Sequence, residues 1–173
     1  MNKKSQHKAQ ISDIKHAADT DIDRILEIIE IGKQTQLANN NPHQWCDEPP
    51  VKAKILEDIK LKRSYVYDDG NIYGTFMFSN KPDPSYANIE DGAWLNEEPY
   101  GVIHRIASDT THTGILHTAI EYAKQTCSNI RIDAHPDNTI MKHLLIKEGF
   151  MRVGIVYIDG KLRREAYHLR SIT

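Results

Sequence analysis

The feature that most constrains the fold is a strand pattern that leads through a polar loop into a buried helix. Val102, His104 and Ile106 share one face of a strand predicted over residues 102–107. After the loop, residues 114–125 form a helix that is apolar on most sides, which is typical of a helix packed inside a domain. A helix that follows a strand in this way allows a parallel crossover in the middle of a sheet.

The rest of the chain alternates helix and strand patterns, which predicts an α/β (α+β) fold with a mixed central sheet flanked by helices. The predicted elements are, in order, a short strand over 11–15, helices beginning near 20 and 51, strands over 64–67 and 72–79, the strand and helix above, a strand over 130–135, a helix over 136–149, and a closing hairpin of 150–158 and 162–169. Residues 86–100 are predicted to be a long loop or a partial strand. At 173 residues the chain fits one domain over 11–173, preceded by a disordered tail over 1–10.

Composition excludes several classes of function. The 22 basic and 24 acidic residues leave a formal charge of −2, without the basic bias of nucleic-acid-binding proteins. No stretch approaches the roughly 20 apolar residues of a membrane span, and the basic start is not followed by the apolar run of a signal peptide. Cys46 and Cys127 form no CxxC unit, so both are interpreted as reduced thiols of a cytoplasmic protein. None of the nine histidines takes part in a known metal-ligand spacing, so no metal is expected.

The loop before residue 114 has the arrangement of an anion site. A polar loop entering a helix presents unpaired backbone N–H groups and the positive end of the helix dipole, which together bind phosphate or pyrophosphate. The residues alone leave an alternative open, an ordinary strand-to-helix turn in which Gly114 supplies flexibility.

Two stretches of the chain together resemble a known family. The first is His104-Arg105-Ile106-Ala107, followed by Asp109, Gly114 and a helix, and the second is Asn138, Met141, Leu144, Leu145, Lys147, Gly149 and Phe150. They resemble the coenzyme A motif and the following helix of the GNAT superfamily of N-acetyltransferases. The early helices and the closing hairpin match in order, so the resemblance covers roughly residues 11–169.

The resemblance implies acetyl-CoA as co-substrate and a binding site for it. The implied contact residues are Ile106, Ala107, Thr111, His112, Thr113, Gly114, Ile115 and Asn138. The chain departs from the family at three positions. Thr111 stands where Gln or Arg is usual, Leu116 where a small residue is usual, and Leu145 where many relatives carry the Tyr that protonates the leaving thiolate. His112 could restore positive charge when it is protonated.

Acetyl transfer to a primary amine needs a base for the ammonium proton. The candidates are His104, beside the implied cofactor, and Glu90 and Asp91, which precede Trp94. A lone strand histidine is also commonly a packed or hydrogen-bonded one, and the two carboxylates also fit a solvated loop.

An acceptor pocket is predicted from aromatic and polar residues. Trp45 and Trp94 lie in segments that flank the substrate end of the cleft in this fold, and Asp133 and His135 share a strand face with Arg131. Two alternatives stay open, in which the tryptophans cover the edge of the core and Arg131 and Asp133 form a surface pair.

The resulting hypothesis is a cytoplasmic enzyme that acetylates a primary amine of a small molecule or a peptide. The alternative is a GNAT-shaped protein without catalysis that binds a ligand or a partner, for which Thr111, Leu116 and Leu145 argue. Neither hypothesis involves nucleic acid or membrane, and the resemblance allows a homodimer.

Overall fold

A computed structural model describes residues 6–45 and 52–171 of the chain. Seven strands form the main sheet in the order β2-β3-β4-β5-β7-β9-β8. Their bounds are β2 Ile14–His16, β3 Ser64–Asp68, β4 Ile72–Ser79, β5 Gly101–Ser108, β7 Asn129–Ala134, β8 Met151–Ile158 and β9 Leu162–Arg170. A second sheet pairs β1 (His7–Lys8) with β6 (His112–Thr113). The helices are α1 Ile22–Ala38, α2 Lys52–Lys60, α3 Ile115–Lys124 and α4 Thr139–Lys147, with 3-10 turns at Ile11–Asp13, Asp19–Asp21 and Pro84–Tyr86.

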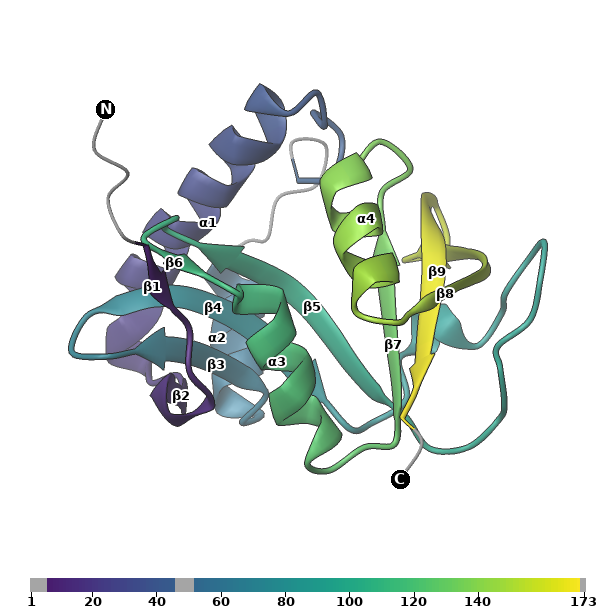
Figure 1. The fold of residues 1–173 in the computed structure, drawn as a ribbon, viewed down its shortest axis with the longest axis horizontal. Helices are drawn as coiled ribbons and strands as arrows, with labels where there is room; N and C mark the ends of the chain where they lie inside the picture. The colour runs from purple at the N-terminus through teal and green to yellow at the C-terminus, as the bar shows by residue number, and fades with distance from the viewer. Residues whose placement is uncertain (1–5, 46–51, 172–173) are drawn as a thin grey trace.

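The helices cover both faces of the main sheet (Figure 1). Isoleucines of α1 and α2 pack with Val66, Trp45 and Ala107 on one face. On the other face, α3 and Leu145 of α4 pack over the sheet in a larger apolar cluster. The segment between β4 and β5 adds a third cluster against β8 and β9. The α1 helix forms here because Ile22, Ile25 and Ile29 recur at helical spacing and are all buried.

The predicted fold class, a mixed sheet flanked by helices, is confirmed. β5 and β7 are parallel, and the other neighbouring pairs of the main sheet are antiparallel. Of the two alternatives predicted for residues 86–100, a long loop or a partial strand, the structure has the loop, with one bridge between Glu90 and Ile155. The predicted helix over 136–149 begins later, at Thr139, because the Asn138 side chain accepts a hydrogen bond from the Met141 N–H and caps it.

The interpretation of residues 1–10 as a disordered tail is wrong for residues 6–10. His7 and Lys8 pair in parallel with His112 and Thr113, and the Ala9 N–H donates to the Thr113 carbonyl at 2.9 Å. The partners are backbone groups of the loop before α3, and no apolar pattern in the sequence predicts such a pairing. Residues 1–5 and Cys46 lie outside the described residues.

The strand predicted over 11–15 is displaced along the chain. Residues Ile11–Asp13 form a 3-10 turn, and the strand that pairs with β3 is Ile14–His16. The Asp13 carboxylate, which accepts a hydrogen bond from the Tyr73 hydroxyl at 2.6 Å, holds the turn against β4.

Candidate functional site

The sheet splits between its two parallel central strands. β5 and β7 pair only at Gly101–Ile130 and Val102–Arg131, and beyond these pairs they diverge (Figure 1). Two cavities lie at the split, one of about 610 Å³ that contains His104 and one of about 660 Å³ that contains Gly114. We call them the His104 cavity and the Gly114 cavity. They share the lining residues Gln36, Trp45, Ile106, Leu116, Asn138 and Met141, so the two spaces meet inside the split.

A β-bulge in β5 lies between the two cavities. Thr75 pairs with Ala107 and Met77 pairs with His104, so Phe76 of β4 faces both Arg105 and Ile106. Arg105 has φ = 50°, a left-handed conformation that side-chain-bearing residues rarely adopt. Bulges of this kind break the hydrogen-bonded ladder and redirect side chains next to binding sites. His104, Arg105 and Ile106, at and beside the bulge, all line the His104 cavity.

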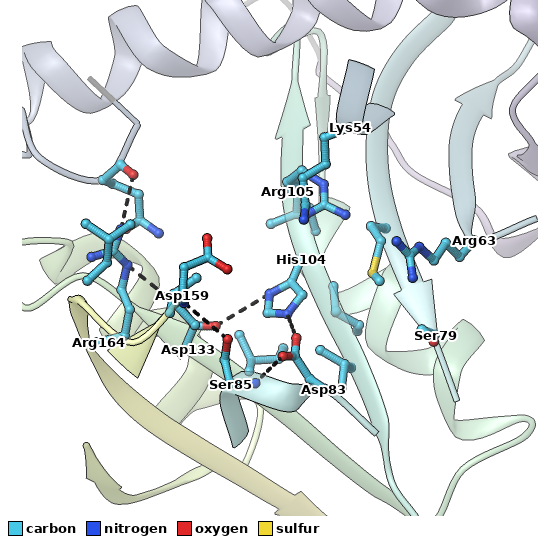
Figure 2. Close-up of a pocket in the computed structure, with 18 of the residues that line it drawn as sticks. Lys54, Arg63, Ser79, Asp83, Ser85, His104, Arg105, Asp133, Asp159 and Arg164 are labelled. Atoms are coloured by element: carbon cyan, nitrogen blue, oxygen red, sulfur yellow. Dashed lines mark hydrogen bonds and ion pairs between the residues drawn. The ribbon is translucent and has the colours of Figure 1, made fainter. Parts of the chain in front are cut away.

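His104 lies between two carboxylates (Figure 2). Its Nε2 is 2.8 Å from Asp83 Oδ2, and its Nδ1 is 3.5 Å from Asp133 Oδ2. The Tyr86 hydroxyl donates to the same Asp133 oxygen at 2.7 Å. A neutral imidazole has a single N–H. The shorter contact favours Nε2–H donating to Asp83, which leaves Nδ1 as an acceptor on the Asp133 side.

The surroundings of His104 fix the protonation states of Asp83 and Tyr86. Burial acts to raise the pKa of the Asp83 carboxyl, but the hydrogen bond and charge of His104 and the N–H of Ser85 outweigh it, so the pKa lies below its ordinary value. Burial, followed by the Asp133 charge, raises the pKa of Tyr86 far above its usual range. Tyr86 is therefore a permanent donor to Asp133, and Asp83 stays ionised and can orient the imidazole.

A second group of charges lines the same cavity and is organised by Asp58. This carboxylate is 1% exposed. Its Oδ1 accepts from Arg63 Nε at 2.6 Å, and its Oδ2 accepts from Arg105 Nη2. Lys54 of α2 and Lys81 also line the cavity. We call Lys54, Arg63, Lys81 and Arg105 the basic cluster.

The Gly114 cavity lies at the N-terminus of α3. Gly114 precedes this helix with φ = 77°, a conformation that glycine adopts without strain. Asp109 joins the loop to α1, because its Oδ2 accepts from Arg24 Nη2 at 2.7 Å while its Oδ1 accepts from the Thr111 N–H at 3.0 Å. Lys8 of β1 lines the cavity beside Gly114. The loop is thus fixed from both sides, and the first turn of α3 is presented to the cavity.

The structure brings half of the predicted cofactor residues to the Gly114 cavity. Those that line it are Ile106, Gly114, Ile115 and Asn138, and those that do not are Ala107, Thr111, His112 and Thr113. Ala107 packs in the cluster beneath α1. The Thr111 hydroxyl donates to Asp109. The His112 ring stacks on Tyr73 at 3.6 Å and lies 3.2 Å from Asp69. These side chains are engaged within the loop, so any role in binding would fall to their backbone.

Some of the predicted catalytic and acceptor residues line the cavities, and others do not. His104, Asp133 and Trp45 line the His104 cavity, and Trp45 is shared with the Gly114 cavity. Glu90 and Asp91 line neither cavity, because the Glu90 backbone pairs with Ile155 on the outer side of β8.

Trp94 and His135 also line neither cavity. Trp94 packs with Tyr86 in the third apolar cluster, where the Arg131 guanidinium lies 4.1 Å from its ring centroid. Arg131 is thus directed at aromatic rings and the Asn96 carbonyl, and the suggested surface pair with Asp133 is not formed. The His135 ring lies 5.8 Å from that of His43.

The partners of His104 and the basic cluster were not predicted from the sequence. Asp83 lies in the segment 81–84, which the pattern marks only as a break between elements. Asp58 is a charged residue, which is usually exposed on a helix, but here it is buried. An acidic residue on the buried stripe of α2, followed five positions later by Arg63, was the one available indication of a buried ion pair.

The described residues include neither a metal-binding cluster nor a membrane-spanning helix. Within residues 6–45 and 52–171, no group of three or more His, Cys, Asp or Glu side chains could hold a metal ion. In the same described ranges, no helix has the length and apolarity to cross a membrane.

Comparison with known proteins finds matches among solved structures. Neither a protein-family model nor a curated protein sequence matches the chain. A GNAT-family acetyltransferase from Streptococcus agalactiae matches at 27% identity and a TM-score of 0.81, over 92% of this chain and 95% of that one. A GNAT-family acetyltransferase from Listeria monocytogenes matches at 21% and 0.66, over 91% and 93%. A chain of the NatC complex bound to Gag peptide and CoA matches at 15% and 0.58, over 92% and 98%.

Proposed function

We propose that this chain, which is a member of the GNAT superfamily of acetyltransferases, transfers the acetyl group of acetyl-CoA to a primary amine of a small molecule or peptide. One observation carries the proposal. Two cavities meet at the split between β5 and β7, one at a helix N-terminus suited to phosphate and the other with a histidine poised between two carboxylates. Such an arrangement suits two substrates that enter separately and react where the cavities meet.

In this proposal the coenzyme occupies the Gly114 cavity. Its pyrophosphate lies at the N-terminus of α3, where backbone N–H groups lack helical partners. Its pantetheine arm extends past Asn138 and Ile106, which line both cavities, and this brings the thioester to the bulge of β5. The bulge leaves backbone groups outside the ladder, and one N–H there would stabilise the oxyanion.

The acceptor occupies the His104 cavity as an ammonium ion beside Asp133. Nδ1 of His104 removes a proton, and the free amine attacks the thioester carbon. A C–N bond forms, the tetrahedral intermediate collapses, the C–S bond breaks, and the sulfur leaves as thiolate. The nitrogen loses its second proton to water, so that the product is a neutral amide. Asp83 holds the ring through Nε2 and stabilises the imidazolium that results.

The departing thiolate is not protonated from the α4 position that carries Tyr in many relatives. Leu145 at that position is 0% exposed and belongs to the core between the sheet and the helices. Since a free thiol has a pKa of about 8.5, departure as thiolate or protonation by water suffices near neutral pH. The compartment, expected to be the cytoplasm, and the oligomeric state stay predictions.

The first test is thermal unfolding with and without millimolar acetyl-CoA. A ligand at about 100 times its dissociation constant adds about 2.7 kcal/mol, which corresponds to a rise in Tm of about 5–10 °C for a chain of this size. Asn138→Asp keeps the helix cap but adds a negative charge to the cavity, so it should reduce the rise. Asn88→Asp makes the same change on an exposed loop and should leave the rise intact.

Release of free thiol in the presence of an amine panel then separates the two hypotheses. A rise in Tm together with amine-dependent thiol release supports the transferase. A rise in Tm without release from any amine supports a catalytically inactive ligand-binding protein, the alternative that Thr111 and Leu116 favour. A folded protein whose Tm does not move would refute coenzyme binding.

A further inference from the structure

The His104 cavity is asymmetrically charged across its width. In Figure 2, Lys54 and Arg105 lie above His104 and Arg63 lies to its right, whereas Asp133 and Asp159 lie to its left. Asp58 is buried and binds the two arginines, Asp83 contacts His104 itself, and Lys81 and Glu57 also line the cavity. The cavity therefore has a positive side and a negative side, with the proposed base between them.

The basic cluster has hydrogen-bond donors to spare. Asp58 engages Nε of Arg63 and Nη2 of Arg105. Among the residues that the structure describes, the other guanidinium N–H groups of these two arginines and the ammonium groups of Lys54 and Lys81 have no protein partner. Since a guanidinium carries five N–H donors in a planar fork, two arginines fixed by one carboxylate can still bind a second carboxylate.

Arg164, on the opposite side of the cavity, is already engaged by protein partners. Arg164 donates from Nη1 to the Arg163 carbonyl at 3.0 Å and from Nη2 to the Gln44 carbonyl at 3.4 Å, and its Nε lies 3.9 Å from Asp133 Oδ1. Asp159, at the turn between β8 and β9, adds a further carboxylate to that side. A ligand cation is therefore favoured beside Asp133 and Asp159, and a ligand anion beside the basic cluster.

We propose that the acceptor is a small amine that also carries a carboxylate, with the amine beside His104 and Asp133 and the carboxylate on the basic cluster. This inference rests on the proposed function and specifies its substrate class. The planar guanidinium forks of Arg63 and Arg105 match the geometry of a carboxylate, and Lys54 adds a point charge. An acceptor with both charges is oriented by the cavity, because only one direction pairs each charge with its opposite.

The test compares amines that differ in one group. Straight-chain ω-amino acids with one to five methylenes are each matched with the corresponding carboxamide and with the amino-alkyl phosphate. The readout is kcat/KM from thiol release with saturating acetyl-CoA. We expect at least one chain length at which the carboxylate form exceeds its carboxamide by about tenfold or more. Equal values for carboxylate and carboxamide at every length would overturn the proposal, and so would preference for the phosphate.

A variant tests whether the basic cluster is responsible. Lys54→Gln removes one charge from an exposed helix position, so folding should be preserved, and Lys60→Gln removes a charge from the same helix outside the cavity. For the preferred amino acid, Lys54→Gln should raise KM several-fold with kcat unchanged, while KM for the carboxamide stays constant. Lys60→Gln should change neither. An equal effect of Lys54→Gln on both amines would contradict a carboxylate contact.

The outcomes separate this inference from the proposed function. Acetylation of amines without regard to the carboxylate would retain the transferase and reject the substrate class. Failure to acetylate any amine would reject both.

Discussion

The segment between β4 and β5 is joined to the sheet through a buried histidine, which makes the fold sensitive to acid. His168 of β9 is 0% exposed. Its Nδ1 accepts the Leu95 N–H at 3.1 Å, and its Nε2 lies 3.1 Å from Asn129 Oδ1. Both contacts suit a neutral ring with its proton on Nε2. Burial, followed by the charge of Arg131, lowers the pKa of His168 from 6.5 to about 4.

The loss of stability in acid follows from the difference between the pKa of His168 in the folded chain and its pKa in the unfolded chain. Between about pH 6.5 and pH 4 the unfolded chain binds a proton that the folded chain does not, so the free energy of unfolding falls as the pH falls. At about 1.36 kcal/mol per pH unit the full loss is about 3.4 kcal/mol, reached below pH 4. About 2 kcal/mol of it is lost between pH 7.5 and pH 5.

The assay is denaturant unfolding of the wild type and of His168→Gln at pH 7.5 and pH 5.0. Glutamine removes the titration, so the wild type should be the more stable protein at pH 7.5, and its advantage should shrink by about 2 kcal/mol at pH 5.0. His143→Gln removes an exposed histidine and should keep the pH dependence of the wild type. An advantage of the wild type over His168→Gln that is the same at both pH values would refute the reasoning.

Three further predictions concern the cavities and their support. His104→Gln should lower kcat at pH 7.5 by about 10²–10⁴, and a loss below tenfold in the thiol-release assay would exclude it as the base. Asp58→Asn should lower the free energy of unfolding by about 2–3 kcal/mol, less than for a fully buried pair because Arg63 and Arg105 are 28% and 16% exposed, and Tm should fall by about 4–12 °C. Gly114→Ala should cost about 1 kcal/mol in denaturant unfolding, from backbone strain alone, because the added methyl group meets nothing closer than Lys8 Cγ at 3.8 Å; an unchanged midpoint would contradict this.

The order of elements in the fold was largely predictable because its patterns are local. The helical spacing of isoleucines in α1 and the turn residues Asp159 and Gly160 act within a few positions of the chain. The errors fall where the deciding contact is distant. β1 forms because His7 and Lys8 reach the backbone of His112 and Thr113, and no short stretch of sequence carries that information.

The same reason explains the partial prediction of the site. His104 was identifiable by its place in the strand before Gly114, but its partners Asp83 and Asp133 come from other segments. Glu90 and Asp91 were also considered as bases because they precede Trp94, which was predicted to line the acceptor pocket. The structure directs Trp94 into the packing over Arg131, which removes the reason for choosing its acidic neighbours.

The bulge in β5 lies where the proposed base, His104, is followed by Arg105 of the basic cluster. Arg105 at φ = 50° has a conformation that costs on the order of 1 kcal/mol or more, and its guanidinium is held by the buried Asp58. In a regular strand, adjacent residues point to opposite faces, and the bulge changes this alternation at Arg105 and Ile106. With the bulge, the proposed base and a carboxylate-binding arginine are consecutive residues that share that cavity. Relaxing the bulge is therefore expected to change how these two side chains are directed relative to one another, and with it the orientation of the acceptor.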